Sequence, residues 1–243
     1  MEYKVFIPSG NPTALVVDGV YDEQRRKEIN NEIMQKHSFI EQVGFLDDKF
    51  NLIMAGGEQC VNAIRCAAYY HMKRLNLNEI KIKNCGEIFS CEKNRRVVSV
   101  KSKVEPDIIR LSDSLYKVRL TGIVHLVCTL NLNFKNEDEF KKYAMGEFEK
   151  YGVKNEKACG FMLLNGLELK PVVYVRDIDT LFYETACGSG TIACAMIRAY
   201  IKKDDVSLRV KQPSGKVLEA TIGTLAGQIY KFKISGEIEE YAW

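Results

Sequence analysis

Two stretches of the sequence, about half the chain length apart, each place a cysteine where a helix is expected to begin. Residues 54–67 read M-A-G-G-E-Q-C-V-N-A-I-R-C-A, and residues 183–196 read Y-E-T-A-C-G-S-G-T-I-A-C-A-M. In each stretch a cysteine, Cys60 or Cys187, is followed by small and apolar residues typical of a buried helix. This match predicts an internal duplication, in which two lobes each present a thiol at a helix N-terminus.

The second stretch has the composition of an anion-binding turn. Gly188 and Gly190 permit a tight turn that gathers backbone N–H groups, and Ser189 or Thr191 is expected to cap the helix that follows. The positive end of that helix would face Cys187, so we expect the thiol to ionise more easily there. A lone cysteine is more often a buried apolar side chain. Two in matching positions favour a catalytic pair.

The remaining chain alternates strand and helix patterns without a low-complexity linker. Helices are expected over residues 22–36, 63–75, 136–151 and 191–201, and a strand over residues 108–120, among others. Each half therefore contains several strands, one interior helix behind a cysteine and one outer helix. We expect an N-terminal lobe over residues 1–110 and a C-terminal lobe over residues 111–234, with residues 235–243 returning to the first lobe.

Composition excludes several classes of function. The formal net charge of +3 is too small to favour nucleic acid, and no apolar run reaches the ~20 residues of a membrane span. The opening residues do not have the pattern of a signal peptide. The eight cysteines include no C-x-x-C pair, and the three histidines show no metal-ligand spacing. We therefore expect reduced thiols, no metal and a cytoplasmic location.

These motifs resemble those of the cofactor-independent, diaminopimelate-epimerase-like superfamily. The carrying residues are Gly10-Asn11, residues 60–66 (C-V-N-A-I-R-C) and residues 184–190 (E-T-A-C-G-S-G). The resemblance covers essentially the whole chain and implies an α+β fold of two pseudo-symmetric lobes, each a β-sheet wrapped around a central α-helix. It places the active site in the cleft between the lobes and implies a small amino-acid substrate and no cofactor. We expect a monomer or a homodimer.

Within the superfamily, the likeness is greatest to the histidine racemases of opine-metallophore biosynthesis, carried by residues 8–11, 41–45, 57–60, 169–174 and 212–215. Diaminopimelate epimerases have an arginine before the second cysteine, which grips the distal carboxylate of their substrate. Residues 180–185 here read T-L-F-Y-E-T, without an arginine. This departure favours a neutral, aromatic or cationic substrate side chain, with histidine first. A second departure is Val61, which replaces the family's glycine.

The resemblance implies racemisation by two bases. Cys60 and Cys187 would lie on opposite faces of the substrate, where one thiolate removes the α-proton and the other thiol returns a proton. Four backbone N–H groups are expected to stabilise the negative charge that develops on the substrate carboxylate: those of Val61, Asn62, Gly188 and Ser189.

Other residues are candidates for holding the substrate. Asn11 and Asn62 are expected near its α-amino and carboxylate groups, and Glu184, with Thr185 beside it, near its α-ammonium. Glu41 lies in an apolar strand, where a carboxylate needs a partner, and we expect it to contact the substrate's side chain, an imidazole.

Alternatives to a histidine racemase remain open from the sequence. One is a diaminopimelate epimerase. Another is an isomerase of the phenazine-biosynthesis type, which lacks the two cysteines and would use Glu41 as its acid and base. A third is a relative without catalytic activity, which would bind a metabolite and exchange no α-proton.

Overall fold

The computed structural model describes residues 1–241. The helices are α1 (Glu23–Lys36), α2 (Val61–Leu75), α3 (Glu137–Lys150), α4 (Gly188–Lys202) and the short 3-10 helix η1 (Arg176–Ile178). The first eight strands are β1 (Tyr3–Pro8), β2 (Thr13–Val16), β3 (Gln42–Leu46), β4 (Asn51–Met54), β5 (Glu79–Asn84), β6 (Glu87–Asn94), β7 (Val97–Lys103) and β8 (Asp107–Arg110). The others are β9 (Leu115–Leu120), β10 (Ile123–Cys128), β11 (Ala158–Asn165), β12 (Glu168–Val175), β13 (Thr180–Tyr183), β14 (Val206–Lys211), β15 (Val217–Leu225) and β16 (Gln228–Glu240).

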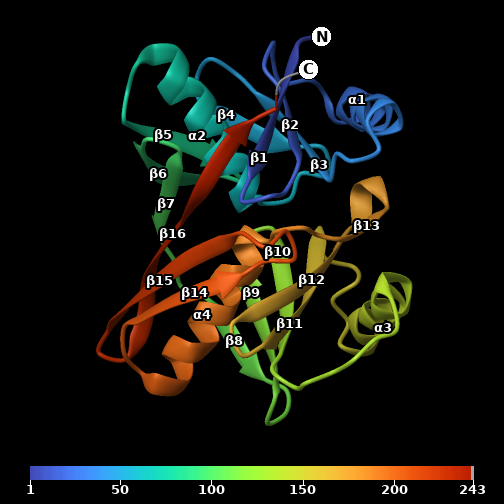
Figure 1. The fold of residues 1–243 in the computed structure, drawn as a ribbon, viewed down its shortest axis with the longest axis vertical. Helices are drawn as coiled ribbons and strands as arrows, with labels where there is room; N and C mark the ends of the chain where they lie inside the picture. The colour runs from blue at the N-terminus through green and yellow to red at the C-terminus, as the bar shows by residue number, and fades with distance from the viewer. Residues whose placement is uncertain (242–243) are drawn as a thin grey trace.

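The strands form one hydrogen-bonded path in the order β1-β2-β3-β4-β5-β6-β7-β16-β15-β14-β12-β11-β10-β9-β8, with β13 beside β12. β1 also pairs with β16, with Phe6 opposite Glu240, and this extra pairing closes β1–β7 and β16 into a ring. The long strand β16 pairs with β15 along its first part and with β7 as well. In Figure 1 it runs from the lower group of strands into the upper one. Residues 242–243, the end of the segment expected to return to the first half, lie outside the described residues.

The two outer helices begin at polar caps. Asp22 accepts a hydrogen bond from the N–H of Arg25 at the start of α1, and Asn136 accepts one from the N–H of Glu139 at the start of α3. Each helix buries a narrow apolar face, such as Ile29 and Ile33 of α1. The sequence-based predictions of these two helices are confirmed to within a residue at each end.

The two cysteine-led helices are buried on most sides. Figure 1 shows α2 among the upper strands, where it contacts β1–β7 and β16, and α4 among the lower ones, where it contacts β10, β11, β14, β15 and β16. Both helices meet apolar side chains around most of their circumference, and they are rich in alanine and branched residues.

Two predicted boundaries were wrong. Residues 108–120 do not form one strand, because the backbone turns at residues 111–114 and separates β8 from β9. The helix expected from residue 191 begins three residues earlier, at Gly188. This earlier start brings Gly188 and Ser189 into the first helical turn.

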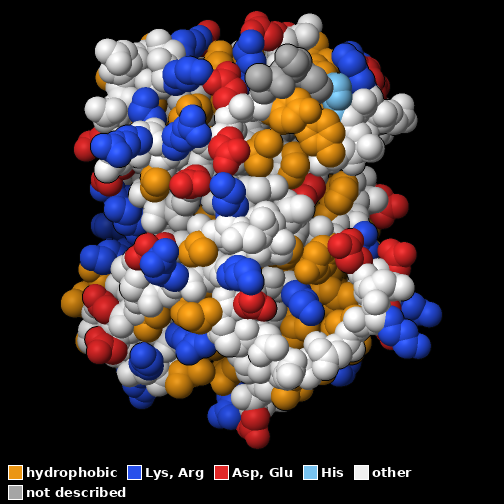
Figure 2. All heavy atoms as spheres, in the orientation of Figure 1, with side chains coloured by type: hydrophobic (Ala, Val, Ile, Leu, Met, Phe, Trp, Pro, Cys, Tyr) orange, Lys and Arg blue, Asp and Glu red, His pale blue; other side chains and the backbone are white. Residues whose placement is uncertain are grey.

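Among residues 1–241, no helix combines the length and the apolar character that crossing a bilayer requires. On the face drawn in Figure 2, acidic and basic side chains alternate over the surface without a broad area of one sign.

Candidate active site

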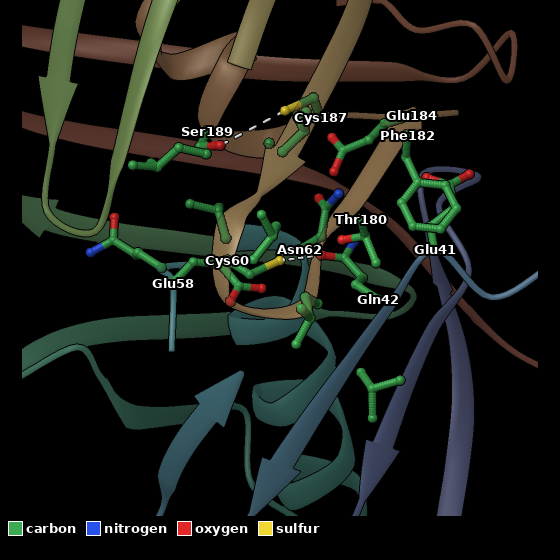
Figure 3. Close-up of a pocket in the computed structure, with 18 residues that line it drawn as sticks. Glu41, Gln42, Glu58, Cys60, Asn62, Thr180, Phe182, Glu184, Cys187 and Ser189 are labelled. Carbon is green, nitrogen blue, oxygen red and sulfur yellow. Dashed lines mark hydrogen bonds between the residues drawn. The ribbon is translucent and has the colours of Figure 1, made fainter. Parts of the chain in front are cut away.

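A narrow cavity of about 40 Å³ lies where the N-termini of α2 and α4 approach each other. Its walls come from β3, the loop before α2, β12, β13 and the loop before α4. It brings together most of the residues predicted from sequence: Glu41, Cys60, Val61, Asn62, Glu184, Cys187, Gly188 and Ser189. Figure 3 shows Cys187 with Ser189 and Glu184 at one end of the cavity and Cys60 with Gln42 and Asn62 at the other.

Each of the two cysteines is the N-cap of its helix. Cys60 has φ −126° and ψ 106°, and its Sγ accepts a hydrogen bond from the N–H of Ala63 at 3.4 Å. Cys187 has φ −122° and ψ 108°, and its Sγ accepts from the N–H of Gly190 at 3.4 Å. The expectation that Ser189 or Thr191 caps α4 was therefore wrong, because the thiol itself takes the capping position.

This cap geometry leaves the first-turn N–H groups at the cavity. Val61 and Asn62 follow Cys60 as the first two residues of α2, and Gly188 and Ser189 follow Cys187 as the first two of α4. The first N–H groups of a helix have no partner within it, so both helix ends offer donors to an anion.

Burial raises the pKa of both thiols well above 9.0. At Cys187 the charge of Glu184 raises the pKa further, while the N–H of Gly190 lowers it. At Cys60 the N–H of Ala63 lowers the pKa, and the charges of Glu184 and Glu58 raise it. The expectation that the helix end makes the Cys187 thiol ionise easily was wrong, because desolvation and the charge of Glu184 outweigh the helix donors.

The Cys60 thiol begins a chain of polar contacts. Its S–H donates to Oε1 of Gln42 at 2.6 Å, and Nε2 of Gln42 donates to Oδ1 of Asn11. Nδ2 of Asn11 then donates to Oε2 of Glu41 at 2.5 Å. The sequence analysis missed Gln42, although its place next to Glu41 at the start of β3 was a signal. Asn11 does not line the cavity but lies behind it, where it holds two residues that do.

Of the three carboxyl groups that line the cavity, Glu41 accepts the most hydrogen bonds. Thr185 donates to Oε1 from its hydroxyl at 2.6 Å and approaches both carboxyl oxygens with its N–H at 3.2 Å, in addition to the contact from Asn11. Burial nevertheless raises the pKa of Glu41 to about 7. Thr185 itself does not line the cavity, so its role in the structure is to hold Glu41.

Glu184 and Glu58 line the same cavity as Glu41. Burial, followed by the charge of Glu41, raises the pKa of Glu184 to about 8, and burial raises that of Glu58 to about 7. The sequence analysis included Glu58 only within residues 57–60, which carry the likeness to histidine racemases, and did not predict it to be a site residue. Among the described residues, none that lines the cavity is a lysine, arginine or histidine. The cavity therefore favours a cationic ligand.

Two amides connect the cysteine loops to the rest of the site. Nδ2 of Asn62 donates to the carbonyl of Ala186 at 2.8 Å, which ties α2 to the loop before Cys187. Oε1 of Gln212, a residue buried at the end of β14, accepts the N–H of Cys187 at 3.0 Å. Both contacts join residues far apart in sequence, and they fix the backbone on which the second thiol sits.

All eight cysteines are free thiols. Within the described part of the chain, no group of three or more His, Cys, Asp or Glu side chains is arranged to hold a metal ion.

The chain as a whole matches a known family. A family model described as the histidine racemase CntK N-terminal domain matches residues 1–242. The chain belongs to this histidine racemase family. It is 26% identical over 241 residues to the histidine racemase of Staphylococcus aureus, covering 90% of this chain and 87% of that protein. It is 30% identical over 231 residues to the histidine racemase of Fusobacterium nucleatum, covering 86% and 84%.

Solved structures with the same fold are more distant in sequence. A phenazine-biosynthesis-type protein from Clostridium difficile superposes with a TM-score of 0.60 at 14% identity, covering 99% of this chain and 96% of that one. A predicted epimerase from Pseudomonas aeruginosa superposes with a TM-score of 0.66 at 13% identity, with the same coverage. These similarities establish an epimerase-like fold, and membership of the histidine racemase family confirms the predicted isomerase class.

Proposed function

We propose that this protein inverts the α-carbon of histidine with Cys60 and Cys187 as its two bases. The observation that carries the proposal is that both cysteines cap helices whose N-termini meet at one cavity. An α-proton of an amino acid is a very weak acid, so its removal requires a strong base on one face and stabilisation of the resulting carbanion. Family membership supports the substrate, since the relatives are named for histidine.

The thiols take opposite roles in one direction of the reaction. The Cys60 S–H already donates to Gln42 at 2.6 Å, which suits a thiol that later gives its proton to the substrate. Sγ of Cys187 lies 3.8 Å from Oγ of Ser189 and accepts the N–H of Gly190, and both groups lower the pKa of this thiol, so they would stabilise a thiolate once the substrate's ammonium offsets the charge of Glu184. The Cys187 thiolate removes the α-proton, and Cys60 delivers its proton to the other face. The reverse direction exchanges these roles.

The substrate's charges supply part of the catalysis. Its carboxylate accepts the first-turn N–H groups of α2 and α4, which oppose the charge that develops on the carboxylate as the α-proton leaves. Its α-ammonium lies against Glu184, whose charge otherwise raises the pKa of both thiols. A bound cation offsets that charge and so lowers the pKa of the thiol that acts as base.

The matching halves support the same mechanism. Residues 1–110 and 111–234 are proposed as pseudo-symmetric lobes, each with a sheet around α2 or α4, and residues 235–241 return to the first. The support is local: the two helices begin at cysteines of nearly equal backbone angles and end at residues of left-handed conformation, Asn76 and Lys203. Because both thiols must remain free, we propose that the protein works in a reducing cytoplasm.

Proton NMR of single L-amino acids in D₂O with the reduced protein tests this function. Loss of the α-proton signal of histidine, accompanied by formation of D-histidine, is expected. Exchange of the α-proton of diaminopimelate alone would mean that diaminopimelate, and not histidine, is the substrate. No exchange of any amino acid would overturn the racemase and favour an isomerase that uses Glu41 or a binding protein.

A further inference from the structure

The proposed mechanism uses neither Glu41 nor Glu58, and of these two cavity carboxyl groups only Glu58 has a buried oxygen without a hydrogen-bond partner among the described residues. Glu58 lies two residues before Cys60, has 6% of its surface exposed and lines the cavity. Its Oε2 is buried and has no hydrogen-bond partner among the described residues. A buried polar oxygen without a donor is costly, so a ligand N–H placed there would gain a contact that the protein alone does not supply.

The other two carboxyl groups are less available. Glu41 already accepts hydrogen bonds from three groups: the amide of Asn11, the hydroxyl of Thr185 and the N–H of Thr185. Glu184 lies beside Cys187 and is assigned to the α-ammonium. Because Glu41 already has three donors, the imidazole expected beside it is assigned instead to Glu58.

The surroundings of Glu58 suit a flat ring with one polar edge. A Cβ atom added at Gly56 would lie 2.8 Å from Oε2 of Glu58, 2.4 Å from Cγ1 of Val175 and 3.6 Å from Cγ1 of Ile178, so these three side chains meet at one corner. All three also line the cavity. In Figure 3, Glu58 and Glu41 lie on opposite sides of Cys60. The corner thus combines apolar walls with one unsatisfied acceptor.

We propose that Glu58 is the specificity-determining residue that accepts the N–H of the substrate's imidazole, with Val175 and Ile178 against the ring. This inference rests on the proposed function. With the α-ammonium at Glu184 and the α-carbon between the thiols, the side chain extends away from Glu184 towards Glu58. An acidic substrate side chain would meet a carboxyl group there and is excluded.

The test compares histidine with 3-(2-thienyl)alanine, which has a similar five-membered aromatic ring but no ring N–H. For Glu58→Gln, the KM for histidine should rise about tenfold, since the amide oxygen can still accept the ring N–H but the hydrogen bond no longer involves a charged group. Its kcat should stay within about threefold, and the inhibition constant of thienylalanine should change less than about threefold. Glu79→Gln, an exposed carboxyl on β5, is the matched control and should leave all three values unchanged.

Several outcomes would overturn the inference. An unchanged KM for histidine would overturn it, as would an equal loss of affinity for histidine and thienylalanine. A fall in kcat at constant KM would instead mean that Glu58 acts only through Cys60. If Glu58→Gln does not fold, Glu58→Asp is compared with the wild type instead. The wild type must bind histidine at least tenfold more tightly than thienylalanine, and Glu58→Asp must reduce that ratio of affinities. Wild-type protein that does not racemise histidine contradicts the proposed function itself.

Discussion

At the scale of single residues, the site is governed by competition between burial and the helix ends. A cysteine at a helix N-terminus is expected to have a low pKa. In this cavity burial and the charge of Glu184 act in the opposite direction at both thiols, and Glu58 adds to them at Cys60, so both thiols hold their protons more strongly than a free cysteine. The substrate's cationic groups therefore matter for activity as well as for binding, because they offset the carboxylates that raise the thiol pKa values.

Glu184 should make stability depend on pH. Its folded-state pKa of about 8 lies above the ordinary value of 4.5. The proton-linked stability of this group is therefore complete below about pH 4.5 and is lost as pH rises through about 8. Glu184→Gln cannot ionise, so its free energy of unfolding should exceed that of the wild type by about 5 kcal/mol at pH 9 and nearly equal it at pH 4.

Urea denaturation of both proteins at the two pH values measures this difference. Glu79→Gln removes an exposed carboxyl group and should show no comparable dependence on pH. A Glu184→Gln variant that is less stable than the wild type at pH 9 would mean that the ionised carboxylate stabilises the fold.

At the scale of elements, the site depends on how closely the first turns of α2 and α4 approach. A Cβ atom at Gly188 would lie 3.0 Å from Oδ1 of Asn62 and 3.2 Å from Cβ of Val61. Gly188→Ala should therefore push the two helix ends apart by a few tenths of an ångström. We expect kcat/KM to fall at least about tenfold, since small misplacements of catalytic groups are costly, and stability to fall by about 1 kcal/mol.

Gly146→Ala is the matched control for this prediction. Gly146 lies within α3, and a Cβ atom there would meet no atom within 4 Å. The alanine should leave activity unchanged and stabilise the protein by about 0.5 kcal/mol through its better helix propensity. Equal kinetics of Gly188→Ala and the wild type would show that the spacing of the helix ends is not critical.

The sequence predicted these elements unevenly, for physical reasons. The caps of α1 and α3, Asp22 and Asn136, are local signals, so those helices were located correctly. The start of α4 was misplaced because cysteine is not a usual N-cap, and the hydroxyl residues downstream were better candidates.

Within the site, the sequence analysis found both cysteines, whose surroundings repeat. It missed the contacts of Gln42, Gln212 and Glu58. The hydrogen bonds of Gln42 to Asn11 and of Gln212 to Cys187 join residues 31 and 25 positions apart. The isolation of Oε2 of Glu58 depends on β12 and η1 packing nearby. Apart from the place of Gln42 next to Glu41, none of these features has a local pattern in the sequence.

At the scale of the whole molecule, β16 connects the parts that build the cavity. Gly236 lies where this strand passes α2, β1 and β15, and a Cβ atom there would lie 2.4 Å from Oγ of Ser9, 2.7 Å from Cδ2 of Leu218 and 2.8 Å from Nη2 of Arg65. Arg65 is fully buried and donates to the carbonyl of Glu237 at 3.0 Å, so this crossing has no spare room.

Gly236→Ala should lower the free energy of unfolding by about 1–3 kcal/mol, as overpacking does in a close-packed interior. Ser235→Ala, one residue earlier in the same strand, should change it by less than about 0.5 kcal/mol. Thermal unfolding of the two variants and the wild type measures the effect. Equal stability of Gly236→Ala and the wild type would mean that β16 can shift freely at this crossing.

The central claim is that two thiols on one cavity carry out the inversion, and single-cysteine variants test it most directly. Racemisation of L-histidine should be followed for Cys60→Ser, Cys187→Ser and, as the control, Cys85→Ser, whose thiol does not line the cavity. Each of the first two variants should lose at least about a thousandfold in rate, because a hydroxyl is a far weaker acid and base here than a thiol. Cys85→Ser should stay within about threefold of the wild type. If either Cys60→Ser or Cys187→Ser folds and racemises histidine at the wild-type rate, the two-thiol account is contradicted.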